Sequence, residues 1–244
     1  MNLYIAGGIL TMNKELLEKE LRYILSDAQY EIFKKNVREH IFLFSPGNTL
    51  LEMTIMYDNP NPALTFYSKD VDGRLRLRTS KVSKGDIFDN TTDSVPKSML
   101  TWKQRIPDYA DTDVRVEKEI EVHFDQEESD FMSLILSDVL KCPRISSYER
   151  YRETFYTDEV EIASDLFPYG HVVELELKHG VEENLVELAK MLGLTSMSRS
   201  RLSCDDLYKL LCKKAGIQSN QDILFADKAM PKINDFLREI IPYL

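Results

Sequence analysis

Charged and apolar residues alternate along the stretch DGRLRLRTSK, residues 72–81, where Arg74, Arg76 and Arg78 are separated by Leu75 and Leu77. Alternation with a period of two predicts a β-strand, because successive side chains of a strand point to opposite faces. One face of this strand is therefore cationic and the other apolar. Like charges on one face are destabilising unless groups of opposite sign lie across from them. The strand therefore requires an acidic surface opposite it.

Other segments alternate in the same way, and their polar faces are segregated by charge. Acidic faces carry the pairs Glu18/Glu20, Glu117/Glu119 and Glu174/Glu176, and a second basic face carries Arg150/Arg152. Any one such strand fits a half-exposed antiparallel sheet with its charged face in water. The set as a whole favours an α+β fold, namely a closed eight-stranded antiparallel β-barrel with a charged lumen and helices packed on its outside. Such a barrel has room for its side chains or for one small ligand.

Helical patterns interrupt these strands. Ser26 followed by Gln29 forms a capping box that predicts a helix start, and Gly193 predicts the end of the helix VEENLVELAKMLG. Residues 203–215 and about 220–240 are predicted as two further helices. We therefore expect a barrel domain at residues 1–200 and a helical extension at residues 201–244 that packs on the barrel. Met12 offers an alternative start, which makes residues 1–11 a disordered leader in this interpretation.

The composition limits the partners of the chain. The net charge of −10 over 244 residues argues against a general nucleic-acid surface, which would show a basic excess. No apolar run reaches the roughly 18–20 residues that span a bilayer, so no membrane association is expected. The three cysteines, Cys142, Cys204 and Cys212, are an odd number without metal-ligand spacing, which favours free thiols and a cytoplasmic location. The sequence is compatible with a homodimer. It contains no P-loop.

The ordered motifs resemble those of the CYTH family, the triphosphate tunnel metalloenzymes. The first strand carries E-x-E-x-(K/R) as Glu18, Glu20 and Arg22, and the later motifs follow in the family's order as MYDNP, LRLR, TWK, VRVEKEIEV, YERYR and IASDLFPYGHVVELEL. The resemblance covers roughly residues 15–195. It implies a barrel that binds a triphosphate group lengthwise. One departure is Arg22, which stands where the family usually has lysine, a side chain with different hydrogen-bond geometry.

Carried over residue by residue, the resemblance implies three sets of site residues. The ligands of Mg²⁺ or Mn²⁺ would be Glu18, Glu20, Glu117, Glu119, Asp165, Glu174 and Glu176. The groups that bind phosphate would be Arg74, Arg76, Arg78, Lys103, Arg115, Arg150 and Arg152. Arg22 and Lys103 would act in catalysis.

Three functions fit this pattern. The first is metal-dependent hydrolysis of a small-molecule triphosphate, either inorganic or organic. The second is a class IV adenylate cyclase, which makes cyclic AMP from ATP. The third is a non-catalytic module that binds polyphosphate or a nucleotide. Phosphoryl transfer needs positioning and charge neutralisation more than covalent help from the protein, so the charged strands suit the first two.

Overall fold

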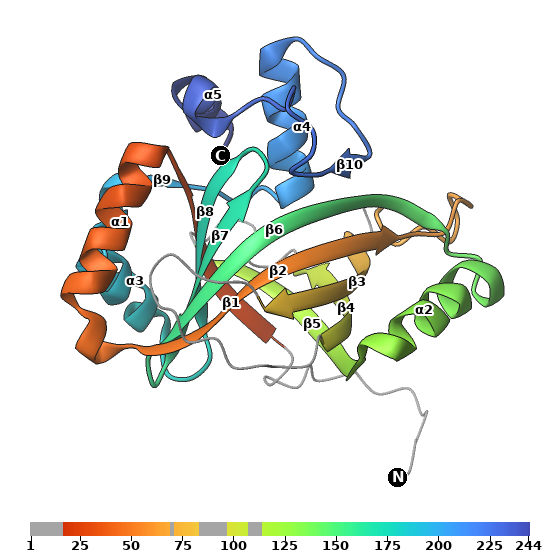
Figure 1. Cartoon of the computed structure of the whole chain (residues 1–244), viewed down its shortest axis with the longest axis horizontal. Coiled ribbons are helices and arrows are strands. Elements are labelled where there is room, and N and C mark those ends of the chain that lie inside the picture. The colour runs from red at the N-terminus through yellow and green to blue at the C-terminus, as the bar shows by residue number, and fades with distance from the viewer. Residues whose placement is uncertain (1–16, 69–70, 83–96, 107–113) are drawn as a thin grey trace.

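The computed structural model describes residues 17–68, 71–82, 97–106 and 114–244, and the predicted leader at residues 1–11 lies outside this part of the chain. Eight antiparallel strands form a closed barrel in the order β6-β2-β3-β4-β5-β1-β8-β7, and β7 pairs with β6 to complete the circle (Figure 1). The strands are β1 (Leu17–Leu25), β2 (Ser45–Tyr57), β3 (Gly73–Val82), β4 (Lys97–Arg105), β5 (Arg115–Asp125), β6 (Arg144–Tyr156), β7 (Val160–Phe167) and β8 (Gly170–Leu177). The predicted fold class is confirmed.

The alternation in the sequence sets which side chains enter the barrel. On β3, Leu77 is buried outside the barrel against Tyr57 and Leu136, whereas Arg76 and Arg78 line the interior. Registers between strands bring inward residues together, for example Glu20 of β1 opposite Glu176 of β8. The charged faces predicted from separate segments therefore meet in one lumen.

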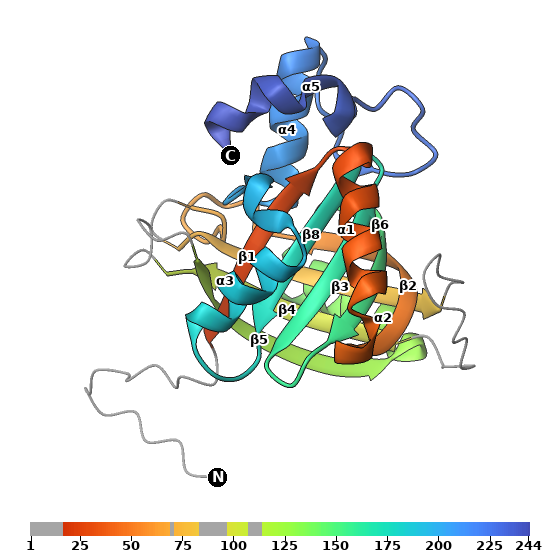
Figure 2. The ribbon, with the colours of Figure 1, turned by 90° about the vertical axis from the view of Figure 1, so that its left-hand side faces the viewer.

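Helices cover the apolar outside of the barrel. Helices α1 (Asp27–Glu39) and α3 (Glu182–Met191) lie on the side formed by β1 and β8 (Figure 2), and Phe33, Val37 and Leu185 pack there in one core with strand residues. Helix α2 (Gln126–Leu134), continued by the π-helical turn η4 (Ile135–Val139), packs near β3 and β4. The predicted capping box of Ser26 and Gln29 opens α1. Short 3₁₀ turns are η2 (Ile41–Leu43), η5 (Leu194–Ser196) and η6 (Ile241–Tyr243).

The C-terminal segment lies across one end of the barrel, at the top of Figure 1. It contains β9 (Ser198–Arg199), α4 (Cys204–Ala215), β10 (Asp222–Ile223) and α5 (Ile233–Ile240). The helix predicted at residues 203–215 is confirmed as α4, but the helix predicted at 220–240 is wrong over its first half. Ile223 is buried and pairs with Tyr148 of β6 in a parallel bridge, and Pro231 disfavours helix before α5.

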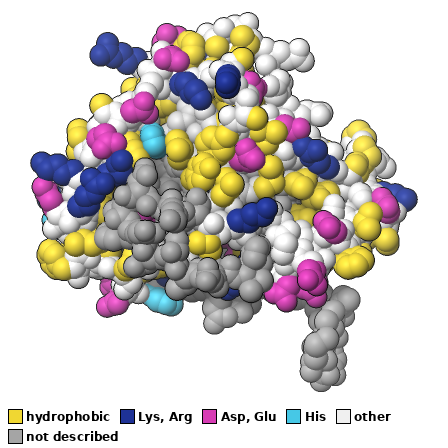
Figure 3. All heavy atoms as spheres, in the orientation of Figure 1, with side chains coloured by type: hydrophobic (Ala, Val, Ile, Leu, Met, Phe, Trp, Pro, Cys, Tyr) yellow, Lys and Arg dark blue, Asp and Glu magenta, His cyan; other side chains and the backbone are white. Residues whose placement is uncertain are grey.

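The outer surface mixes charges of both signs. On the described part of the face in Figure 3, basic and acidic side chains are interspersed among hydrophobic ones. Within the described residues, every helix is too short or too polar to cross a membrane.

Candidate functional site

The inward side chains of all eight barrel strands enclose a cavity of about 210 Å³, here called the tunnel. Most of the predicted site residues line it. They are Glu18, Glu20, Arg22, Arg74, Arg76, Arg78, Lys103, Arg115, Glu117, Glu119, Arg150, Arg152, Glu174 and Glu176. Asp165 does not line the tunnel, although it contacts two arginines that do.

Lys103 of β4 provides a positive charge among the carboxylates of β1 and β5. Its Nζ forms an ion pair with Glu18 and a second one with Glu119, at 3.1 Å from Oε1. Burial opposes the charged ammonium, but Glu18, Glu119 and Glu20 together outweigh burial and raise the pKa of Lys103. Lys103 is therefore a permanent cation in the acidic part of the tunnel.

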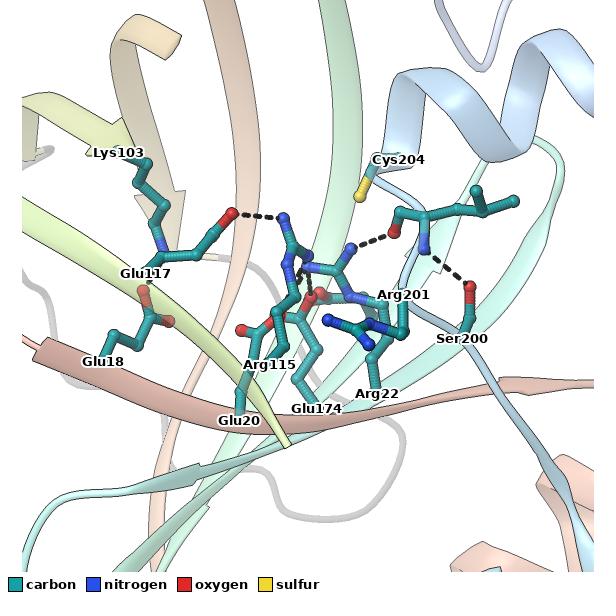
Figure 4. Close-up of polar contacts among 12 residues, drawn as sticks. Glu18, Glu20, Arg22, Lys103, Arg115, Glu117, Glu174, Ser200, Arg201 and Cys204 are labelled. Carbon is teal, nitrogen blue, oxygen red and sulfur yellow. Dashed lines mark hydrogen bonds and ion pairs between the residues drawn. The ribbon is translucent and has the colours of Figure 1, made fainter. Parts of the chain in front are cut away.

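Arg22 and Arg115 bridge carboxylates at the end of the tunnel nearer α4 (Figure 4). Arg22 lies 3.0 Å from Glu20 and 2.6 Å from Glu174, and Arg115 lies 3.0 Å from Glu20 and 2.7 Å from Glu117. Each guanidinium thus forms ion pairs with two carboxylates, and Glu20 is shared by both. Such pairing offsets the cost of burying the charges.

A second network lies on the wall formed by β2, β6 and β7. Arg150 donates to Glu52 at 2.6 Å and to Asp165 at 3.0 Å, and Arg152 donates to Asp165 and to Glu174. Burial alone would raise the pKa of Glu52, but Arg150 and Arg78 outweigh burial and hold that pKa at about 2. The sequence analysis did not identify Glu52. Glu52 shares its face of β2 with Thr54 and Met56, and this alternation was the available signal. Because those two residues are uncharged, the segment did not show a charged face.

Several tunnel arginines keep buried N–H donors that no described residue accepts. These donors are Arg22 Nε, Arg76 Nε, Arg115 Nε and Arg150 Nη2. Buried polar groups in proteins are normally hydrogen-bonded, and guanidinium groups match the geometry of phosphate oxygens. The tunnel therefore has donors available for an anion with several oxygens.

The start of α4 lies at one end of the tunnel, where Ser203, Cys204 and Asp205 contribute to its wall. Arg22 Nη1 donates to the carbonyl oxygen of Leu202 at 2.5 Å, which ties this segment to the barrel. The Sγ atom of Cys204 points toward the arginines in Figure 4, and burial raises the pKa of this thiol. No sequence signal pointed to these residues, because their contacts with β1 span about 180 positions.

The carboxylates of the tunnel are suitable in kind for a divalent cation. Among the described residues, no three His, Cys, Asp or Glu side chains converge closely enough to form a metal site. Burial and the nearby Glu174 raise the pKa of Glu20 to about 7 despite Arg22, and burial and Glu18 raise that of Glu176 to about 8. The positive charges near these two carboxylates are thus too few to keep them ionised. Carboxylate oxygens are the ligands that Mg²⁺ and Mn²⁺ prefer. The donors are therefore of the kind that such an ion binds, although in this structure they pair with Lys103, Arg115 and Lys178.

Comparison with known proteins shows the fold. No family model matches the chain, and no curated protein matches its sequence. A candidate adenylate cyclase from Vibrio parahaemolyticus superposes with a TM-score of 0.59 at 18% identity, covering 80% of this chain and 98% of that one. The PH1819 protein of Pyrococcus horikoshii OT3 gives 0.56 at 24% identity, covering 80% and 99%. The candidate adenylyl cyclase HpAC1 from Hippeastrum, whose dominant activity is that of a triphosphatase, gives 0.52 at 15% identity, covering 84% and 98%. The predicted likeness to the triphosphate tunnel fold is thereby confirmed.

Proposed function

We propose that this protein binds a triphosphate along its tunnel and hydrolyses it with the help of Mg²⁺ or Mn²⁺. The observation that carries the proposal is the set of buried, unpartnered guanidinium donors of Arg22, Arg76, Arg115 and Arg150 in a cavity that also holds carboxylates. The shared fold supports it, because one structural match has triphosphatase activity. Burying this many cations is costly, and a sheet face that merely contacts water would not need to bury them.

The two kinds of charge have different roles in this proposal. Arg76, Arg78 and Arg152 bind phosphate oxygens, and Lys103 neutralises the charge that develops during the reaction. Glu18, Glu20 and Glu176 hold the divalent cation, with Glu117, Glu119 and Glu174 beside them. When bound, the cation withdraws charge from the phosphate oxygens. The contacts of Asp165 favour a different role from the predicted metal ligand, which is to position Arg150 and Arg152.

The reaction places a water molecule in line with the terminal phosphorus. The oxygen of the water forms a bond to phosphorus while the bond from phosphorus to the bridging oxygen breaks. A tunnel carboxylate that does not hold the cation accepts the proton of the water. The leaving diphosphate carries its charge into the arginine wall, where fixed donors stabilise it without reorganisation.

Product analysis tests the proposal. The protein is incubated with tripolyphosphate and with ATP, each with Mg²⁺, with Mn²⁺ and with EDTA. Release of orthophosphate that depends on the cation is expected. Cyclic AMP with pyrophosphate would identify a cyclase instead, and binding without any product would identify a non-catalytic module.

A further inference from the structure

Helix α2 and the turn η4 present an apolar stripe on the outer surface of the molecule. The members of this stripe are Phe131, Leu134, Ile135, Val139 and Leu140, all of which are exposed, Phe131 by 68% and Val139 by 70%. The inner side of the same segment packs on the barrel, where Leu136 is buried in one cluster with Leu77 of β3. Folding of the chain therefore covers only one of the two apolar sides of this segment.

The apolar surface continues onto β5, the strand that leads directly into α2. Ile120 and Val122 are 43% and 53% exposed on the outer face of β5, the same face from which Phe124 packs with Met132 of α2 against the cluster around Leu136. Helix α2 lies at the right-hand edge of the molecule in Figure 1, on the outside of the barrel. Single exposed apolar side chains are ordinary, but a contiguous group of them marks a site of interaction.

The two ends of the apolar stripe carry opposite charges. Glu127 and Asp130 are exposed near the start of α2, and Lys141 is exposed just beyond η4. Asp138 is also exposed, but its Oδ1 accepts a hydrogen bond from Ser137 Oγ at 2.9 Å. The stripe is therefore bounded by acidic side chains at its N-terminal end and by a lysine at its C-terminal end.

We propose that this surface joins two copies of the protein, with α2 antiparallel to α2 of the second copy across a two-fold axis. A two-fold contact uses the same patch on both copies, so the patch must be complementary to itself. With the axis near Ile135, Phe131 packs against the partner's Val139, and Asp130 lies beside the partner's Lys141 at both ends of the contact. A parallel arrangement of the two helices would instead bring like charges together.

The charges also distinguish a second copy from a lipid surface. Helices that lie on membranes carry lysine and arginine around their apolar face, because lipid headgroups are often anionic. The stripe on α2 begins beside Glu127 and Asp130, which such headgroups would repel. A second copy of the chain supplies a lysine for Asp130 and covers the apolar side chains at the same time.

Sedimentation velocity at rising protein concentration and low salt tests the inference. The proteins are the wild type, Phe131→Ala, Asp130→Lys, Lys141→Asp and an equimolar mixture of the last two. The controls Asp235→Lys and Lys228→Asp reverse exposed charges of the C-terminal segment. Thermal unfolding verifies that each variant is folded.

The wild type and both controls should form dimers of equal affinity. Phe131→Ala should raise the dissociation constant of the dimer about tenfold or more, as is typical when a buried aromatic side chain of an interface is truncated. Asp130→Lys and Lys141→Asp should each weaken the dimer several-fold, because each sets two pairs of like charges against each other.

The mixture of Asp130→Lys and Lys141→Asp should regain the affinity of the wild type, because each copy then meets opposite charges on the other. A wild type that stays monomeric at every concentration overturns the inference and leaves the surface to a different partner. A dimer that Phe131→Ala does not weaken also overturns it, as does a mixture that binds no more tightly than the single variants.

Discussion

Arg152 and Asp165 lie directly opposite each other on β6 and β7 and form a two-pronged ion pair inside the barrel wall. Nε donates to Oδ1 at 2.7 Å and Nη2 donates to Oδ2 at 2.6 Å. Arg150 Nη1 donates to the same Oδ2 at 3.0 Å, and the side chain of Asp165 has no exposed surface. Both oxygens of this carboxylate are therefore used to fix the guanidinium groups that face the tunnel.

Replacing Asp165 by Asn should destabilise the protein by about 3–5 kcal/mol, because each of two buried guanidinium groups loses one of its two charged partners. Urea unfolding measures this loss, and Asp235→Asn on the surface of α5 is the control, with an expected change within about 0.5 kcal/mol. The stabilisation of the folded protein by added Mn²⁺ should persist in Asp165→Asn. Loss of the Mn²⁺ effect in this variant alone would show instead that Asp165 is a metal ligand.

Lys103→Gln should separate cation binding from turnover. Removal of the ammonium group between Glu18 and Glu119 takes away the internal counterion of these carboxylates, so Mn²⁺ should bind more tightly. Turnover of tripolyphosphate should fall by about 10²–10³-fold, as is typical when a group that stabilises developing charge is removed. Calorimetry with Mn²⁺ and phosphate release measure the two effects. The exposed Lys97 of the same strand provides the control Lys97→Gln; equal behaviour of both variants would refute the role of Lys103.

The cation-free protein should lose stability as pH rises from about 5 to 8. Glu176 has a pKa of about 8 in the folded state, raised by burial and Glu18 above the ordinary 4.5. Between these values the folded state binds a proton that the unfolded state does not, so its stability falls with rising pH. Urea unfolding with EDTA at both pH values measures the slope. Glu176→Gln should reduce the slope and leave the part that Glu20 contributes, whereas Glu187→Gln on the exposed face of α3 should retain the full slope. An unaltered slope in Glu176→Gln would contradict the assignment.

The lumen could be predicted from the sequence because its signal is local. The period-two alternation of Arg74, Arg76 and Arg78 fixes which face of β3 they share, and burying the opposite face against helices fixes which face points inward. The same reasoning placed Glu18 and Glu20 in the tunnel. Charge segregation between strands then predicted that the cationic strand faces a wall of carboxylates across the barrel.

What the sequence did not predict depends on contacts between distant segments. Glu52 lies among uncharged inward neighbours, and its ion pairs with Arg78 and with Arg150, 98 positions away, reveal its role. Asp205 reaches the tunnel because the C-terminal segment crosses the barrel end. The segment around Ile223 was predicted as helix because its pairing with β6 leaves no periodic pattern in so short a strand.

Arg76 provides a direct test of phosphate binding, because it makes few contacts with the described residues. Its one ion pair is with Glu119 at 3.3 Å, and Glu119 keeps Lys103 as a partner when Arg76 is removed. Its Nε is buried without an acceptor among the described residues. Arg76→Ala should therefore fold normally, because the change removes a buried donor that has no acceptor among the described residues.

We expect Arg76→Ala to weaken the binding of imidotriphosphate, an analogue whose NH bridges prevent hydrolysis, by about 1.5–3 kcal/mol, the range for a hydrogen bond to a charged group. Titration calorimetry measures this loss, and it should shrink at high salt by less than a surface contact would, because buried pairs are screened less. Orthophosphate should bind far more weakly than the triphosphate to the wild type, since it reaches fewer donors. The control is Arg38→Ala on the exposed side of α1. Equal affinities for the wild type, Arg76→Ala and Arg38→Ala would mean that the arginines of β3 do not bind the triphosphate.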